Sequence, residues 1–248
     1  MNAALYALTH RGNPGDAAFY EEICRGARSV LELGSGYGRL LSVLARPKRR
    51  VVGLELDRAF IALARKSLRS LAPSKRRSIQ LVQGDMRDFS FAQPFERVLL
   101  PYNALYCLLN QREALACFRA ARRALVPGGV LVLDVWNAES FHHAALAGAQ
   151  ISDVAALPPL QYAGRTWDVL ERAKLRRNRQ RLDVNYTYVP RSAGQAREIL
   201  IQQRYFLPSE IESLLRRAGF ALEARYGGFK RRRFTPRSAQ LVLLARAT

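Results

Sequence analysis

The sequence predicts an α/β protein built on a doubly wound, mostly parallel sheet. Over roughly the first 135 residues, short apolar runs alternate with stretches of helical period, which is the pattern of repeated strand and helix units. The first apolar runs end in glycines or acids, and ligands of such sheets bind at the carboxyl ends of the strands. The chain has 248 residues, 49% of them hydrophobic, which suffices for one large core that carries an insertion.

The elements of this sheet follow one another in a regular order. A turn and helix cap at Asn13 to Asp16 precede the first helix of the sheet region, which is expected to lie over the ligand cleft. The first strand begins at Val30. The later strands are expected at 51–57, 79–83 and 98–103, and the helices at 17–23, 40–45, 58–71 and 111–125.

The most informative segment is 30–40, where an apolar strand ends at Glu32 and runs into Gly34, Gly36 and Gly38. Glycines at a sharp turn from strand to helix let backbone N–H groups approach a ligand closely. A dinucleotide site needs its third glycine one residue later, and the carboxylate of Glu32 would repel a diphosphate. A P-loop is excluded because no Gly-Lys-Ser/Thr follows. The segment therefore predicts a nucleoside site that accepts a cationic group.

The ends of the next strands supply further polar residues for this ligand. Glu55 lies at the distance beyond the first glycine that suits a carboxylate accepting from ribose hydroxyls. Asp85 and Met86 follow the third strand, where an acid and an apolar residue suit the amino group and the face of an adenine. The fourth strand ends beside the ligand at Pro101 and Tyr102.

With these motifs in this order, the chain resembles the class I S-adenosylmethionine-dependent methyltransferases over roughly its first 135 residues. Residues 32–38 resemble the first motif of that family, Glu55 its ribose-binding acid, and Asp85 with Met86 its adenine contact. Residues 126–133 resemble the Pro-Gly-Gly turn that leads into its fifth strand. The resemblance implies a Rossmann-like, seven-stranded sheet with an antiparallel last strand. It also implies S-adenosyl-L-methionine as cofactor and S-adenosyl-L-homocysteine as product.

Within this family the chain is most similar to small-molecule N-methyltransferases, including those that dimethylate amino sugars, and more distantly to glycine and sarcosine methyltransferases. Leu5 and Tyr6, followed by His10, resemble the start of the amino-sugar enzymes, in which a tyrosine reaches the cofactor carboxylate. The residues expected in the cofactor site are Tyr6, Glu32, Gly34, Ser35, Gly36, Gly38, Glu55, Leu56, Asp85, Met86, Pro101 and Tyr102.

After Asn137 the pattern changes to a small antiparallel insertion behind the fifth strand. Three alternating stretches, 166–175, 181–190 and 198–205, are joined by polar hairpin loops. We therefore divide the chain into a cofactor-binding core with an N-terminal helical cover at 1–137, an insertion at 138–206 that serves as substrate lid, dimer contact or both, and 207–248, which completes the core sheet.

The last segment begins with a helix and ends with two strands. Ser209 with Glu212 predicts a capping box at the start of the helix, and Gly219 ends it. The final strands are expected at 220–225 and 240–245, and the resemblance makes the last one antiparallel.

Methyl transfer from a sulfonium requires mainly alignment, and a base only where the acceptor must lose a proton. The candidate catalytic residues are Tyr102, Tyr106 and His10, and each has a plainer alternative. Tyr102 would pack against the cofactor, Tyr106 would belong to the core, and His10 would lie in an exposed loop. His142 and His143 are interpreted as surface or lid residues.

The net charge of +20 raises nucleic acid as a possible partner. Two basic clusters, 48–50 and 75–77, are expected in solvated loops opposite the cofactor, whereas 176–181 and 230–233 fall in the substrate half. The stretch after the fourth strand lacks the Asn/Asp-Pro-Pro-aromatic and Pro-Cys motifs of base methyltransferases. RNA methylation therefore ranks second, and a cofactor-binding protein without methyl transfer is a further alternative.

The remaining features predict a protein in the cytoplasm that methylates a small-molecule acceptor, with an amine favoured. No apolar run has the length of a membrane span, and the start lacks the pattern of a signal peptide. Cys24, Cys107 and Cys117 have neither metal nor disulfide spacing and are interpreted as small buried hydrophobes. The sequence leaves open whether the insertion forms a homodimer contact.

Overall fold

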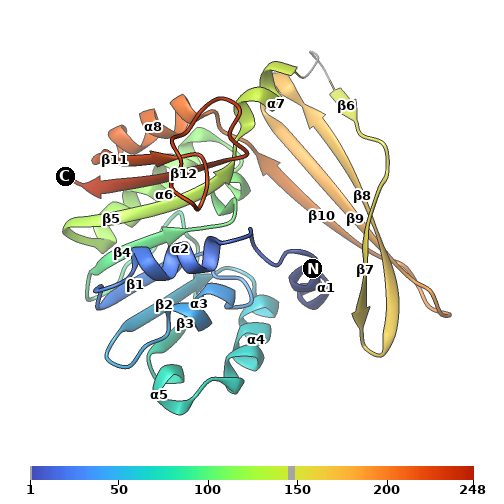
Figure 1. The fold of residues 1–248 in the computed structure, drawn as a ribbon, viewed down its shortest axis with the longest axis horizontal. Helices are drawn as coiled ribbons and strands as arrows, with labels where there is room; N and C mark the ends of the chain where they lie inside the picture. Colours follow the sequence, from blue (N-terminus) through green and yellow to red (C-terminus); the bar gives the residue numbers. More distant parts are fainter. Residues whose placement is uncertain (1, 145–148) are drawn as a thin grey trace.

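The computed structural model, which describes residues 2–144 and 149–248, contains a seven-stranded sheet beside a smaller inserted sheet (Figure 1). The strand order of the larger sheet is β11-β12-β5-β4-β1-β2-β3. Strands β1 to β5 are parallel, and β12 is antiparallel to both β5 and β11. The predicted fold is thereby confirmed. These strands are β1 (Ser29–Leu33), β2 (Arg50–Glu55), β3 (Ile79–Gln83), β4 (Phe95–Leu100), β5 (Leu125–Trp136), β11 (Phe220–Tyr226) and β12 (Gln240–Ala247).

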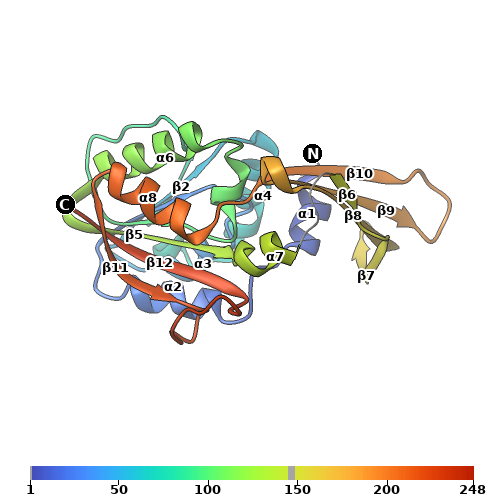
Figure 2. The same ribbon diagram turned by 90° about the horizontal axis from the view of Figure 1, so that it is seen from above.

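Helices cover both faces of this sheet, with α6 and α8 on one face and α2 and α3 on the other (Figure 2). Residues of β1 alternate between the two layers: Val30 packs in the cluster on the α2 and α3 side, and Leu31 and Leu33 pack in the other. The helices are α1 (Ala3–Thr9), α2 (Asp16–Ile23), α3 (Arg39–Leu44), α4 (Arg58–Ser67), α5 (Pro73–Arg76), α6 (Gln111–Ala124), α7 (Ala138–Ala144) and α8 (Pro208–Arg217), with short 3-10 turns at Leu68–Ser70, Ala104–Cys107 and Arg177–Arg179.

The insertion is a five-stranded antiparallel sheet, larger than the predicted three strands. The three expected strands are present as β8 (Arg165–Arg176), β9 (Arg181–Pro190) and β10 (Arg197–Arg204), and β6 (Ala149–Ile151) and β7 (Ala155–Tyr162) were not predicted. The β7 strand contains two prolines, which cannot donate to a ladder, and its register with β8 shifts between Leu157 and Leu160. Because prolines disfavour strands, the sequence did not predict this edge strand.

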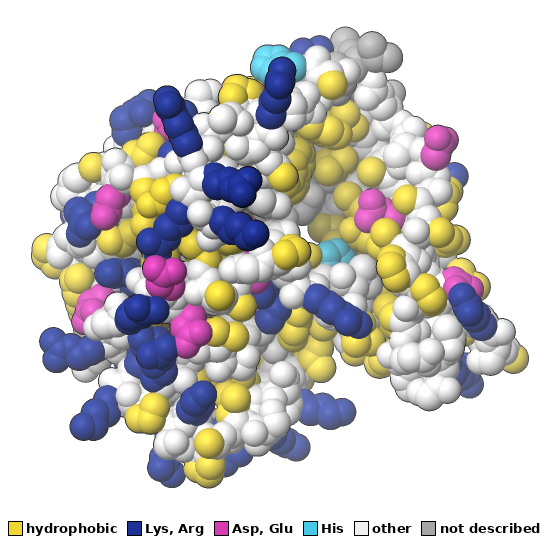
Figure 3. All heavy atoms as spheres, in the orientation of Figure 1, with side chains coloured by type: hydrophobic (Ala, Val, Ile, Leu, Met, Phe, Trp, Pro, Cys, Tyr) yellow, Lys and Arg dark blue, Asp and Glu magenta, His cyan; other side chains and the backbone are white. Residues whose placement is uncertain are grey.

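Helix α1 connects the two sheets (Figure 1). Leu5 is fully buried in a third apolar cluster, together with Trp167 and Val169 of β8 and Tyr188 of β9. These inward residues alternate with outward ones along each strand, as expected for an antiparallel sheet with one covered face. The N-terminal helix therefore packs against the inserted sheet as well as the core, and apolar side chains line the hollow between that sheet and the core (Figure 3).

The predicted cap of α8 is wrong. The helix begins at Pro208, which suits a first helical position because it has no N–H to leave unpaired. The side chain of Glu210, not Glu212, reaches back, and its Oε2 accepts from the backbone N–H of Leu207 at 2.9 Å. Ser209 lies inside the first turn.

The basic cluster at 48–50 is only partly solvated, which corrects the interpretation of these residues as loop charges. Arg49 is buried, and its guanidinium donates to the backbone oxygens of Cys24, Ala27 and Leu44 at 2.7 to 3.0 Å. Arg50 lies over the ring of Phe95 at 4.0 Å. These two arginines therefore stabilise the fold, and their charges are part of the net charge of +20.

Within 2–144 and 149–248, no helix is both long enough and apolar enough to cross a bilayer.

Candidate active site

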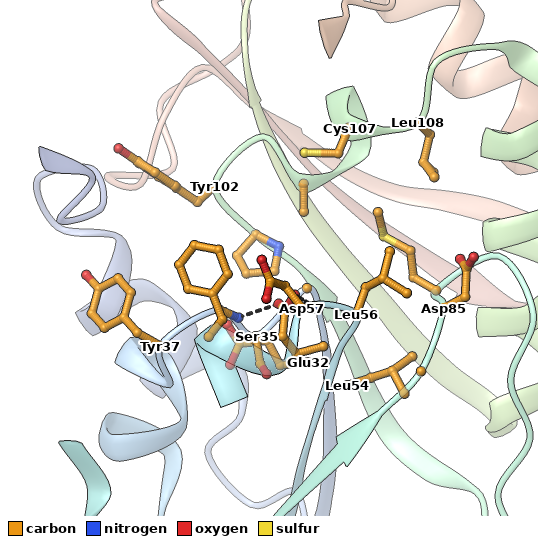
Figure 4. A pocket seen from close by; sticks show the side chains of 18 of the residues that line it. Glu32, Ser35, Tyr37, Leu54, Leu56, Asp57, Asp85, Tyr102, Cys107 and Leu108 are labelled. Carbon is orange, nitrogen blue, oxygen red and sulfur yellow. Dashed lines mark hydrogen bonds between the residues drawn. The ribbon is translucent and has the colours of Figure 1, made fainter. Parts of the chain in front are cut away.

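A cavity of about 520 Å³ lies at the carboxyl ends of β1, β2, β3 and β4. It contains every residue predicted for the cofactor site except Gly38, together with His10. Figure 4 shows Glu32, Leu56, Asp85 and Tyr102 around this cavity. Tyr37, Cys107 and Leu108 complete its walls near the core, and Ile201 of β10 contributes from the inserted sheet. The cavity thus joins strand ends of the core to α1 and β10.

The glycine turn is left-handed at each of its three glycines. The φ angles are 69° at Gly34, 53° at Gly36 and 80° at Gly38, a region that residues with a Cβ rarely adopt. A Cβ built on Gly36 would meet nothing within 4 Å, because it would point into the cavity. Gly38 has another purpose: a Cβ there would lie 3.3 Å from that of Ala64, so this glycine allows α3 and α4 to pack closely.

Glu55 is held in place at the end of β2 by two backbone N–H groups. Its Oε2 accepts from Gly36 at 2.8 Å, and its Oε1 accepts from Asp57 at 2.9 Å. A carboxylate has about four acceptor positions, so two stay available to a ligand. The glycine turn and this acid therefore form one preorganised unit.

Glu32 lines the cavity, and within 2–144 and 149–248 its Oε2 has no hydrogen-bond partner. It is 4% exposed, and burial raises its pKa to about 8, with Arg39 opposing and Glu55 adding to the effect. The Oγ of Ser35 is also buried and unpaired among the described residues. A cationic group and a hydrogen-bonding group of a ligand would satisfy both atoms.

Leu56 and Met86 line the side of the cavity where an adenine is expected, and Leu56 is 62% exposed. Asp85 pairs with Arg87, whose Nη2 lies 2.5 Å from Oδ2, and this interaction lowers the pKa of Asp85. The carboxylate is therefore ionised and able to accept from an amino group. Cys107 corrects the prediction of a buried thiol, since it is exposed to the cavity, although the surrounding protein raises its pKa to about 11.

His10 lies among aromatic rings at the end of the cavity nearest the inserted sheet. Its Nδ1 is 3.0 Å from the backbone oxygen of Tyr6. Since a carbonyl only accepts, Nδ1 carries the hydrogen and Nε2 of the neutral ring is free to take a proton. The ring of Tyr6 is stacked at 4.0 Å, that of Tyr186 stands edge-on at 4.9 Å, and that of Tyr102 lies at 6.4 Å. Burial lowers the pKa of His10.

Tyr102 reaches the cavity from a strained turn after β4. Both Tyr102 and Asn103 are left-handed, with φ of 52° and 62°. Asp134, a buried acid in β5 that the sequence did not single out, holds this turn: its Oδ1 accepts from the N–H of Tyr102 at 3.0 Å and from the hydroxyl of Tyr20 at 2.5 Å. Burial raises the pKa of Asp134 to about 6.

The structure does not bring Tyr106 into the cavity. Its side chain is fully buried, and its hydroxyl donates to the backbone oxygens of Trp136 at 2.8 Å and Phe206 at 3.3 Å. Another residue was missed: Arg39 lines the cavity and forms a two-point ion pair with Asp16, at 2.9 and 2.6 Å. This pair links α3 to α2.

The fold, the glycine turn and the acids at successive strand ends resemble those of the class I S-adenosylmethionine-dependent methyltransferases. The family model of a methyltransferase domain matches residues 30–129. The predicted resemblance to methyltransferases is thereby confirmed.

Similar proteins include two curated relatives from Streptomyces. The chain is 32% identical to cypemycin N-terminal methyltransferase of Streptomyces sp over 117 residues, 47% of this chain and 45% of that protein. It is 31% identical to dTDP-3-amino-3,6-dideoxy-alpha-D-glucopyranose N,N-dimethyltransferase of Streptomyces fradiae over 142 residues, 54% of this chain and 52% of that protein. The chain spans about half the length of the curated relatives it matches.

Solved structures resemble nearly the whole chain. The CcbJ methyltransferase from Streptomyces caelestis has a TM-score of 0.81 at 26% identity, covering 98% of this chain and 95% of that one. The amino pentose methyltransferase CalS10 from Micromonospora echinaspora, solved with bound S-adenosylmethionine, has a TM-score of 0.72 at 25% identity, covering 98% and 97%. The inserted sheet is therefore part of the shared architecture.

Proposed function

We propose that the protein transfers a methyl group from S-adenosylmethionine to the nitrogen of a small-molecule amine. The observation that carries this proposal is the contrast between the two ends of the cavity. One end has acids and a glycine turn, and the other has an aromatic wall with the free Nε2 of His10. The relatives from Streptomyces fradiae and Streptomyces venezuelae are named as amino-sugar N,N-dimethyltransferases, which favours a nitrogen acceptor.

The cofactor would be held by residues of four elements. Glu55 would accept from the ribose hydroxyls and Asp85 from the adenine amino group, with Leu56 and Met86 against the adenine faces. The unpaired carboxylate of Glu32 would pair with the ammonium of the methionine part. The remaining predicted contacts are Tyr6 toward the cofactor carboxylate, the backbone of Gly34, Ser35 and Gly36, and packing by Pro101 and Tyr102.

The bound cofactor supplies an electrophilic methyl carbon on a sulfonium, so the protein has to align the acceptor and remove its proton. Alignment supplies on the order of 7–11 kcal/mol in favourable cases. In this proposal His10 takes the proton at Nε2, and Tyr102 positions the acceptor from its strained turn. Tyr106 receives no catalytic role because its hydroxyl is engaged in the core.

RNA methylation remains the second candidate because of the net charge of +20. The structure weakens the charge argument, since Arg49 is buried against backbone oxygens and Arg39 is paired with Asp16. We also propose that the protein forms a homodimer through the inserted sheet. Val189 and Leu200 are exposed on this sheet, and a second copy of the chain would cover them.

Release of S-adenosylhomocysteine tests the function. The acceptors to compare are dTDP-linked amino sugars, short peptides with a free N-terminus, simple primary and secondary amines, phenols and RNA. We expect turnover with an amine, and at least a tenfold loss of kcat/KM in His10→Gln with cofactor affinity retained. Turnover with RNA alone, or tight cofactor binding without turnover of any acceptor, would overturn the proposal. The mass of the protein in solution tests the homodimer.

A further inference from the structure

A carboxylate of the inserted sheet lies on the sheet face that packs against α1. Glu171 of β8 is paired directly with Tyr186 of β9 across the strands, so the two side chains share one face of the sheet. Trp167 and Val169 precede Glu171 at intervals of two residues and are buried in the cluster that contains Leu5 of α1. The half-buried carboxylate of Glu171 therefore lies on the face that meets α1.

His10, directly after the last residue of α1, contacts this face. Its ring stands edge-on to that of Tyr186 at a centroid distance of 4.9 Å. Ile201 of β10 lies on the same face and lines the cavity, two residues beyond Ile199, which pairs with Tyr186. The row that contains Glu171 is therefore next to the row that forms the cavity wall.

The side chains that pack around His10 are mostly uncharged tyrosines. Tyr6 of α1, Tyr102 after β4 and Tyr186 of β9 present neutral rings, and Tyr37 donates its hydroxyl to the backbone oxygen of His10 at 3.1 Å.

Arg39 lies over the ring of Tyr102 at 5.8 Å, and its charge is compensated by Asp16. Burial lowers the pKa of His10. The hydrogen bond to the backbone oxygen of Tyr6 opposes this effect in part, and the charge of Glu171 opposes it to a smaller extent.

We propose that Glu171 is a positioning residue that acts through His10 and that the two suit an acceptor which enters the site as an ammonium ion. This inference rests on the proposed function. The carboxylate attracts the ammonium and stabilises the imidazolium that forms when Nε2 takes one proton. The neutral nitrogen then forms its bond to the methyl carbon while the carbon–sulfur bond breaks, and that electron pair stays on sulfur. The methylated nitrogen carries the positive charge.

The pair has a consequence for pH dependence. A buried histidine without an acid would be a weak base and would take a proton from an ammonium ion poorly. Removing the charge of Glu171 lowers the pKa of His10, so the acidic limb of the kcat/KM profile moves to lower pH. The maximum also falls, because the attraction for the cationic acceptor is lost.

The decisive measurement is an NMR titration of the histidine rings in the full-length protein with bound S-adenosylhomocysteine. His10→Gln assigns the His10 signal. Glu171→Gln keeps the size of the side chain and removes its charge, and Glu198→Gln is the matched control. Glu198 is exposed on the opposite face of the same sheet, next to Ile199 in β10. We expect a lower pKa of His10 in Glu171→Gln and no change in Glu198→Gln.

Kinetics with the best amine of the acceptor panel complete the test. We expect at least a fivefold loss of kcat/KM in Glu171→Gln, with KM for the amine raised and the acidic limb at lower pH. An unchanged pKa of His10, or an equal change in the control, overturns the inference while leaving amine methylation intact. If the pKa of His10 falls as expected but no amine is methylated, the coupling of Glu171 to His10 is supported and the proposed function is wrong.

Discussion

The two ends of the cavity are built in different ways. At the cofactor end, Glu32, Gly36 and Glu55 lie within one strand, turn and strand unit, and backbone N–H groups hold the acid of the second strand. At the acceptor end, His10 meets Tyr186, which comes from the inserted sheet far along the chain. The first end depends on local backbone geometry, and the second depends on the docking of α1 against β8 and β9.

This difference matches the boundary of the family model. The family model covers 30–129, which includes the cofactor end and excludes both α1 and the inserted sheet. A backbone conformation that exposes N–H groups to a ligand tolerates few side chains, whereas an aromatic wall can change residue by residue. Variants at the cofactor end should therefore change cofactor affinity, and variants at the acceptor end should change the acceptor kinetics.

The strongest test of this contrast is Gly36→Val. A valine would adopt a φ of 53° only with strain, and its side chain would fill the space that the ligand needs. We expect at least a 100-fold loss of affinity for S-adenosylhomocysteine in calorimetry, about 3 kcal/mol.

Gly26→Val is the matched control for backbone strain. Gly26 also has a positive φ, of 83°, with open space around its Cβ, but it lies outside the cavity. It should lose thermal stability and keep its affinity. Normal affinity in a folded Gly36→Val protein would contradict the placement of the ligand against this turn.

A smaller effect at the same end is expected for Glu55→Ala. The substitution removes the acceptor for ribose hydroxyls and releases the N–H of Gly36 that organises the turn. The loss should be about 1–3 kcal/mol of binding free energy for S-adenosylhomocysteine, measured by calorimetry. Glu21→Ala, a change at an exposed ion pair on α2, should leave affinity unchanged. Equal affinity of both variants would remove Glu55 from the site.

The protonation of Glu32 gives a further test of the cofactor end. Its pKa of about 8 lies above the ordinary 4.5, so the folded protein binds this proton more strongly than the unfolded chain between these values. Stability of the ligand-free protein should therefore fall as the pH rises through this range, and Glu32→Gln should remove that component.

Binding of a ligand through its ammonium group should ionise Glu32. At pH 7 we expect release of about one proton per bound S-adenosylhomocysteine, read from calorimetry in buffers of different ionisation enthalpy. The release should disappear in Glu32→Gln. Equal proton release in the two proteins would show that the ligand does not pair with this carboxylate.

The same contrast explains how far the sequence could be interpreted. The glycine turn, Glu55 and Asp85 were predicted because each lies in a short contiguous motif with a fixed place at a strand end. Asp134 has no such motif, because its partners Tyr20 and Tyr102 come from other parts of the chain. Glu171 was missed for the same reason, since only the register of β8 and β9 places it opposite Tyr186.

Apparent exceptions in the fold also have physical causes. Strand β7 escaped prediction because its prolines oppose strand pairing, yet they are tolerated at an edge with a shifted register. Arg49 was expected in water because arginine is rarely buried, but three backbone oxygens satisfy its guanidinium. In both cases long-range contacts override a sound local preference.

The smallest expected effect concerns Tyr106, which follows the fourth strand but lies outside the cavity. Tyr106→Phe leaves the backbone oxygens of Trp136 and Phe206 without its hydroxyl, at a cost of about 1–2 kcal/mol of unfolding free energy in urea. With an amine that the wild type methylates, kcat/KM should stay within about twofold, because the hydroxyl faces carbonyls rather than a ligand. Tyr102→Phe serves as the comparison inside the cavity. A tenfold loss of kcat in Tyr106→Phe with unchanged stability would instead mean that the acceptor end extends behind the turn at Asn103, and the boundary between core and acceptor wall would have to move.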